Sequence, residues 1–249
     1  MTDIASPSAP LARRRFLVGA ASVLALAAAG CTTSRPTAPV VPPAPPIPEW
    51  ALLMYGPKFD EQFPLPAVDL RQIEPQFWRQ RVDYPTNETP GTVIVDTGAR
   101  FLYHVEEGGT AMRYGVGIGR AGFTWSGRAH IAYKREWPVW TPPSAMIERQ
   151  PELEQWRHGQ PPGLTNPLGA RALYIHQGGQ DTLYRLHGTS EDWSIGRAVS
   201  SGCVRLLNHD IIDLYDRVRS GSALVVLPST EPMPFTGVTQ GNTAEPFAL

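Results

Sequence analysis

The sequence lacks an excess of charge of either sign. Its 249 residues carry 22 lysines and arginines against 23 aspartates and glutamates, which gives a formal net charge of -1. A protein that binds DNA or RNA through the phosphate backbone needs a positive field, and the chain as a whole has none. We therefore expect no nucleic-acid partner.

Cysteine is scarce, since the chain has two, Cys31 and Cys203. A disulfide framework is excluded, and a bridge between these two is disfavoured because Cys31 lies beside a proline-rich stretch where a crosslink would constrain little structure. The histidines show no His-Glu-x-x-His motif and the cysteines no paired spacing, so we expect no metal site. Each cysteine needs its own explanation.

Residues 1–30 have the pattern of an export signal. Three arginines at 13–15 precede an apolar run over 17–30, which is too short to span a bilayer comfortably. The arginines followed by Phe-Leu resemble a twin-arginine signal, although the general secretory route fits as well. Residues 28–31, Ala-Ala-Gly-Cys, resemble a lipobox, which predicts a lipid on Cys31, a membrane contact and a periplasmic location in the envelope. The alternative is simple cleavage to an unanchored periplasmic protein.

The rest of the chain divides by composition. Residues 31–49 form a proline-rich tether, with seven prolines in 36–48. Prolines also interrupt 50–90, which we interpret as an irregular extension packed onto the following domain. Regular patterns occupy 91–228, the predicted catalytic domain. The tail at 229–249 is rich in Pro, Thr and Gly, and we expect it to be flexible.

The regular part is predicted to be mostly β with a few helices. Short runs rich in β-branched and aromatic residues occur at 92–96, 101–105, 129–133, 172–176, 183–187 and 223–227. Two glycines at 178–179 indicate a hairpin. One helix follows Cys203, because apolar residues repeat every three or four positions from 211 to 218. Asn208 is its expected N-cap and Gly221 its expected stop.

A histidine and a cysteine flank the segment with the strongest chemical signal. His187 ends a predicted strand and stands 16 positions before Cys203. A thiol is mostly protonated at neutral pH, so we expect the His187 imidazole to ionise Cys203 and the sulfur to face solvent. Gly188 and Gly202 adjoin them, where a Cβ would crowd an acyl group. Alone, each residue has an ordinary structural explanation; together they predict a nucleophile and its base.

Two further features complete the predicted site. Gly202 allows the main-chain amides of Ser201, Gly202 and Cys203 to point one way and form an oxyanion hole. Arg205 stands two positions past Cys203, so in an extended stretch its side chain leaves on the same face. Its guanidinium could grip a substrate carboxylate at two points, and the alternative is an ordinary surface charge.

Through His187-Gly-Thr and Ser200-Ser-Gly-Cys-Val-Arg205, the sequence resembles the YkuD-type L,D-transpeptidase catalytic domain. The resemblance extends over about 91–228 and is specific, because the motif residues fall in the family's order and spacing. It implies a β-sandwich-like fold. One departure is Ser201, at a position where many members carry a second histidine, so a secondary role of that side chain is in doubt.

The resemblance also implies a reaction on peptidoglycan stem peptides. Cys203 would attack the carbonyl of the L-centre of diaminopimelate in a tetrapeptide stem and expel D-alanine, and an amine would then resolve the thioester. His187 would act as base and acid, oriented by the main-chain carbonyl of Gly188. Thr189 and Ser200 would join the arginine in binding substrate. No cofactor is required.

Several other functions compete with this one. An L,D-carboxypeptidase would resolve the same acyl-enzyme with water, and the acceptor amine could belong to an envelope protein. Papain-like amidases place Cys before His, the reverse of the order here. Sortases place His much further upstream and a Thr before their Cys, where this chain has Gly202. A non-catalytic lipoprotein that binds peptidoglycan would leave Cys203 buried and inert.

An aromatic stretch at 123–143 has two equally weighted interpretations. It contains Phe123, Trp125, Trp137 and Trp140. These side chains line a substrate groove in one interpretation and belong to the core in the other.

Overall fold

The short apolar runs fold into strands, and the turn residues between them reverse the chain. The computed structural model describes residues 46–119, 126–200 and 203–228. Within these residues the strands are β1 (Gln80–Asp83), β2 (Val93–Asp96), β3 (Phe101–Val105), β4 (Thr110–Gly115), β5 (Ile118–Gly119), β6 (Gly127–Glu136), β7 (Arg171–Gln177), β8 (Gln180–Thr189), β9 (Ala198–Ser200), β10 (Val204–Leu207) and β11 (Ala223–Leu227).

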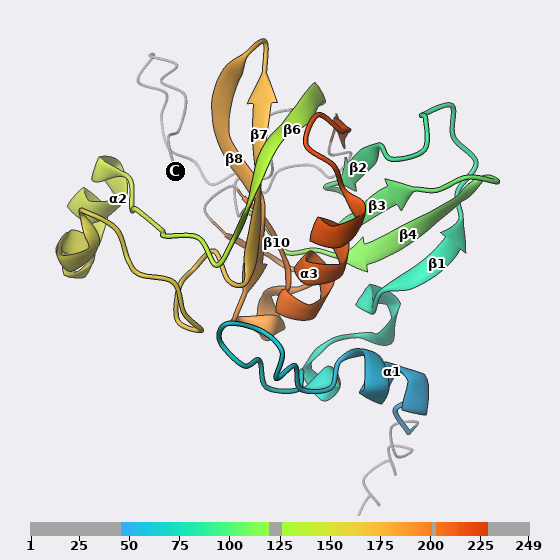
Figure 1. The fold of residues 1–249 in the computed structure, drawn as a ribbon, viewed down its shortest axis with the longest axis horizontal. Coiled ribbons are helices and arrows are strands. Elements are labelled where there is room, and N and C mark those ends of the chain that lie inside the picture. The colour runs from blue at the N-terminus through green and yellow to red at the C-terminus, as the bar shows by residue number, and fades with distance from the viewer. Residues whose placement is uncertain (1–45, 120–125, 201–202, 229–249) are drawn as a thin grey trace, which may run out of the picture. The chain divides into compact units, whose positions relative to one another are not determined.

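One main sheet contains most of these strands, in the order β1-β4-β3-β2-β11-β6-β7-β8-β10, and β5 pairs with β9 beside it. Its two halves contribute to one core: Leu102 from β3 and Leu186 from β8 belong to the same buried cluster as Ile211. Ile211 lies on α3 (Asn208–Arg217), which Figure 1 shows between the two groups of strands. The mostly β architecture with few helices is confirmed.

Helix α3 is the helix predicted to follow Cys203, but both predicted boundaries, Asn208 as the N-cap and Gly221 as the stop, were wrong. Asn208 is its first residue, with Leu207 at the N-cap position, and the helix ends at Arg217. The Asn208 side chain does not cap the helix, because its Oδ1 accepts a hydrogen bond of 2.8 Å from the Ala170 amide. Gly221 lies in the following loop with a φ of 89°. The remaining helices are α1 (Glu49–Met54), α2 (Ser144–Arg149) and the 3-10 turns η1 (Leu70–Gln72), η2 (Pro75–Phe77), η3 (Pro151–Trp156) and η4 (Asp192–Ser194).

The described part of the N-terminal extension has more regular structure than its prolines suggested. Besides α1, it contributes the edge strand β1, which pairs antiparallel with β4. Between Pro75 and Pro85 there is room for a short strand, and an edge strand needs partners on one side only. The extension also builds a second buried cluster with Ile195 and Leu207 of the domain. It therefore supports the segment that surrounds Cys203.

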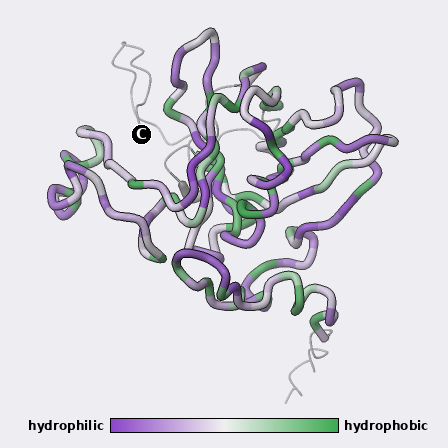
Figure 2. Tube along the Cα trace, in the orientation of Figure 1, coloured by the Kyte–Doolittle hydropathy of each residue, from purple (hydrophilic) through white to green (hydrophobic). Residues whose placement is uncertain are grey.

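Hydrophobic positions gather at the centre of the domain around α3, and outer loops are more polar (Figure 2). Among the described residues, no helix combines the length and hydrophobicity needed to cross a bilayer.

A buried polar cluster fastens the extension to α3. Asp210 has no exposed surface and accepts a hydrogen bond of 3.2 Å from the Tyr55 hydroxyl. Arg79 lies 3.8 Å from Asp210 and 3.2 Å from Asp213. Burial raises the pKa of Asp210 to about 7, although Arg79 opposes that shift. The pKa of Asp213 is lowered, because hydrogen bonds from Arg217 and Tyr114 outweigh its burial.

We expect Asp210→Asn to flatten the pH dependence of stability. The folded state raises the pKa of Asp210, so the favourable contribution of its protonated form is complete below about pH 4 and is lost as the pH rises towards 7. Asparagine keeps an oxygen for Tyr55 and removes the titration. Urea unfolding should show that the mutant escapes a loss of roughly 4 kcal/mol between these pH values.

The control is Asp213→Asn. The pKa of Asp213 is lowered, so its contribution exists above the unfolded pKa and disappears as the pH falls. Removing it should cost stability at neutral pH and not at acid pH. Parallel curves for wild type and Asp210→Asn would contradict the assignment.

Candidate active site

The two predicted catalytic residues lie near the end of β8 and directly before β10. These strands pair in parallel, with Arg205 opposite His187 and Val204 opposite Leu186. Paired residues on neighbouring strands point to the same face, and residues two apart along a strand do so too. His187 therefore shares a face with Arg205, and Cys203 directly precedes β10.

The position of the His187 ring is set by its own neighbour in the chain. His187 Nδ1 lies 2.7 Å from the Gly188 carbonyl oxygen, which can only accept, so Nδ1 donates and Nε2 carries the lone pair. The side chain is buried, with 5% of its surface exposed. Burial lowers the pKa of His187 to about 4, and nearby Arg205 and Arg185 act in the same direction. The imidazole is therefore neutral at physiological pH.

The Cys203 sulfur is also more protected than we expected. Its exposed fraction is 6%, so the expectation of a solvent-facing sulfur was wrong. Burial raises the pKa of the Cys203 thiol to about 11, against the opposing effects of a main-chain hydrogen bond from Arg185 and of the charges on Arg185 and Arg205. The expected ionisation of the thiol by His187 was therefore wrong for the resting protein. In the resting protein the Cys203 thiol and the His187 imidazole are therefore both uncharged.

Gly188 is needed for a different reason from the predicted one. A Cβ at Gly188 would lie 2.2 Å from Asn208 Oδ1 and 3.1 Å from the Ala170 amide nitrogen. The close neighbour is thus the first residue of α3 and not an incoming acyl group. The absence of a side chain lets the end of β8 approach α3, and the carbonyl that holds His187 is fixed there.

The sequence model of the YkuD-type L,D-transpeptidase catalytic domain matches residues 90–227. This is more than half of the chain. The chain belongs to the YkuD L,D-transpeptidase family. The resemblance seen in the motif is therefore confirmed, and with it membership of a family of cysteine-dependent transferases.

Curated relatives carry the same family name. "Probable L,D-transpeptidase ErfK/SrfK" of Escherichia coli K12 is 32% identical over 168 residues, which is 66% of this chain and 51% of that protein. "Probable L,D-transpeptidase YbiS" of the same strain is 33% identical over 163 residues, 61% of this chain and 51% of that protein. The chain spans about half the length of these relatives.

Among solved structures, one from Brucella melitensis, titled as a probable carnitine operon oxidoreductase, is 46% identical, with 64% of this chain and 99% of that chain covered and a TM-score of 0.45. An L,D-transpeptidase from Mycobacterium smegmatis is 19% identical, with 55% and 58% covered and a TM-score of 0.41.

Arg205 forms an ion pair with Glu191, a residue that the sequence analysis did not identify. Its Nη1 pairs with the Glu191 carboxylate. Thr189 has 3% of its surface exposed, and its hydroxyl accepts a hydrogen bond of 3.0 Å from the Glu191 amide. Thr189 therefore shapes the loop that presents Glu191.

A second arginine missed from the sequence is Arg185. It lies two positions before His187 on β8, and its guanidinium pairs with Asp181 at 2.7 Å and covers the Tyr174 ring at 4.4 Å. The alternation of strand side chains could have placed it on the His187 face once β8 was recognised.

Some predicted residues lie outside the described part. These are Cys31, Ser201, Gly202, Phe123 and Trp125, and the side chain of Ser200 is likewise not described. Within the aromatic stretch, Trp137 is 4% exposed and its Nε1 donates to Glu61 at 2.9 Å, so this tryptophan belongs to the core. In the described residues, no group of three or more His, Cys, Asp and Glu side chains could hold a metal ion.

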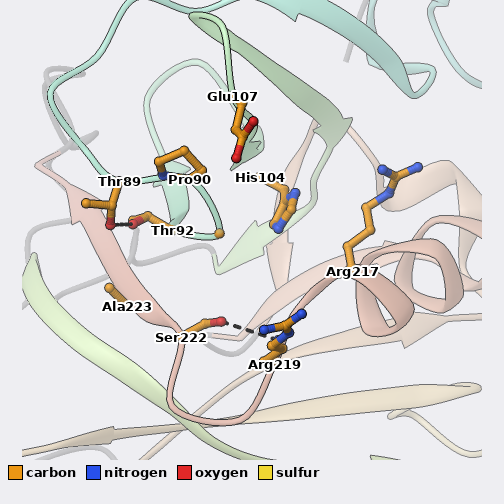
Figure 3. A pocket seen from close by; sticks show the side chains of 10 residues that line it. Thr89, Pro90, Thr92, His104, Glu107, Arg217, Arg219, Ser222 and Ala223 are labelled. Atoms are coloured by element: carbon orange, nitrogen blue, oxygen red, sulfur yellow. Dashed lines mark hydrogen bonds between the residues drawn. The ribbon is translucent and has the colours of Figure 1, made fainter.

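A cavity of about 550 Å³ lies elsewhere, around the carboxyl end of α3 (Figure 3). His104, Arg217, Arg219 and Ser222 are among its lining residues, and none of the predicted catalytic residues is. Figure 3 shows the His104 ring directed into it. The cavity is separate from the thiol and imidazole pair.

We expect the neutral pair to be visible by titration. The ring of His187 should titrate near pH 4 in NMR spectra, because burial lowers its pKa. The thiolate absorbance of Cys203 should appear only in strongly alkaline solution, because burial raises the thiol pKa to about 11. His187→Gln and Cys203→Ser identify the two signals. A thiolate signal at neutral pH that disappears in both variants would show an ion pair instead.

Proposed function

We propose that the chain is a peptidoglycan L,D-transpeptidase acting on the periplasmic side of the cell envelope. The observation that carries this proposal is the parallel pairing of β8, which contains His187, with β10, which begins directly after Cys203. Family membership and the relatives' printed names support the same activity. Cys203 is the nucleophile and His187 the general base and acid.

The first half-reaction forms a thioester. Cys203 Sγ attacks the carbonyl of the L-centre of diaminopimelate in a tetrapeptide stem, and the thiol proton passes to His187 Nε2. A neutral imidazole whose Nδ1 donates to the Gly188 carbonyl has its lone pair on Nε2 and can accept that proton. Collapse of the tetrahedral intermediate breaks the bond to D-alanine, whose nitrogen takes the proton from His187.

The second half-reaction regenerates the thiol. An acceptor amine attacks the thioester, His187 receives a proton from the amine, and the Cys203 sulfur leaves and is reprotonated. The amides of Ser201, Gly202 and Cys203 are proposed as the oxyanion hole, which stabilises the negative charge in both halves. The acceptor is the amine of a neighbouring stem, giving a 3-3 crosslink, or an amine of an envelope protein.

Substrate binding and anchoring complete the proposal. Arg205, with Thr189 and Ser200 beside the site, binds the stem, and the chemistry needs no cofactor. A lipid on Cys31 holds the protein at the membrane, and the proline-rich residues 31–49 let the domain reach the wall. The export signal at residues 1–30 delivers the chain there.

Incubation with a disaccharide tetrapeptide tests the activity. We expect the full-length wild type to release D-alanine and form crosslinked dimers, followed by mass spectrometry. Cys203→Ser and His187→Gln should each lower the rate by about 10³-fold or more, because they remove the nucleophile and its base. Circular dichroism should show that both variants remain folded.

The alternatives give different products. D-alanine release without dimers or attachment to an added amine indicates an L,D-carboxypeptidase. No release by the wild type, with stem binding retained, indicates a non-catalytic peptidoglycan-binding protein and refutes the proposal.

A further inference from the structure

The Arg205–Glu191 ion pair lies beside the catalytic groups and is open to solvent. The exposed fractions of the side chains are 20% for Arg205 and 48% for Glu191. Ion pairs this exposed contribute little to folding stability, so stability is a weak reason for their presence. Arg205 lies opposite His187 in the β8–β10 register, and paired residues on neighbouring strands point to the same face of the sheet. A pair in this position can contact the substrate.

The structure holds Glu191 in place through its main chain. Its amide donates to Thr189 Oγ1 at 3.0 Å, and its carbonyl accepts a hydrogen bond of 2.8 Å from the Ser194 amide. Ser194 has no exposed surface and Ile195 is packed in the second buried cluster. The backbone of Glu191 is therefore anchored on both sides, and its carboxylate contacts Arg205.

The two charges match the free end of diaminopimelate. This amino acid has an amino and a carboxyl group at each end, and only one end is incorporated in the stem peptide. The other end is a zwitterion with an ammonium and a carboxylate on one carbon. Arg205 stands two residues after Cys203, which corresponds to about 6.6 Å between the two Cα atoms for an extended chain. Three methylene groups can bridge from a carbonyl at Cys203 to that region.

This inference rests on the proposed function: we propose that Glu191 and Arg205 together bind the zwitterionic end of the diaminopimelate side chain of the donor stem. Glu191 binds its ammonium and Arg205 its carboxylate. An ammonium held by a carboxylate stays protonated and cannot attack a thioester. The pair therefore recognises the donor side chain and not the attacking amine. Before binding, the two residues neutralise each other; after binding, each faces a charge of the substrate and the four charges alternate.

Three donor stems test this assignment. The first contains diaminopimelate, the second has the free amine of that residue acetylated, and the third has lysine, which keeps an ammonium and lacks the carboxylate. D-alanine release gives kcat/KM for wild type, Glu191→Gln and Arg205→Gln. The control variant is Glu88→Gln, which breaks another exposed ion pair, to Arg128, away from the β8–β10 edge.

We expect the wild type and Glu88→Gln to prefer diaminopimelate over its acetylated form by about tenfold or more, as for a hydrogen bond between charged groups. Glu191→Gln should lose that preference and treat both donors alike, while still preferring diaminopimelate over lysine. Arg205→Gln should lose the preference over lysine. A uniform loss on all three donors, or no change, in Glu191→Gln would overturn the inference, because a structural role does not distinguish the donors.

Binding measurements separate this inference from the catalytic proposal. In Cys203→Ser, calorimetric dissociation constants for the three stems should follow the same order, and Glu191→Gln in that background should again make the first two equal. If no variant releases D-alanine but this order in affinity remains, the proposed reaction fails and the inference stands. If D-alanine is released and the affinities are equal, the inference alone fails.

Discussion

The site depends on the register in which β10 lies beside β8. Arg205 opposite His187 fixes which side chains share the catalytic face, and Leu186 opposite Val204 fixes those that enter the core. Side chains alternate along a strand, so a slip by one residue would turn Arg205 into the core. Leu186, Val204 and Leu206 have no exposed surface, and exposing them in exchange for a buried arginine would be strongly unfavourable.

The first residue of α3 links the β8–β10 register to the orientation of His187, the proposed base. Asn208 Oδ1 binds the Ala170 amide and occupies the space next to Gly188, so the helix, β8 and the residue before β7 meet at one point. The Gly188 carbonyl then sets the tautomer of His187. The main chain at the end of β8, held against α3, therefore determines which imidazole nitrogen of His187 carries the lone pair.

Sequence reasoning found what is encoded locally. The periodicity of α3, the apolar run of β2 and the hairpin at 178–179 depend on neighbours in the chain, and they were predicted correctly. The capping of α3 was missed because the side chain of Asn208 binds Ala170, 38 positions away. The partner of Arg205 was missed for a related reason: Glu191 stands in an irregular loop, where no periodicity indicates its direction. Burial of the thiol was also not predictable, because it depends on how strands and loops pack around Cys203.

Burial also explains why arginines close to a thiol do not ionise it. Arg185 is paired with Asp181, and Arg205 with Glu191, so each positive charge near Cys203 is offset by a carboxylate. The remaining potential is too small to overcome desolvation, and the thiol pKa rises. Water therefore meets mainly an uncharged thiol in the resting protein, because neither arginine offers an uncompensated positive charge that would stabilise a thiolate.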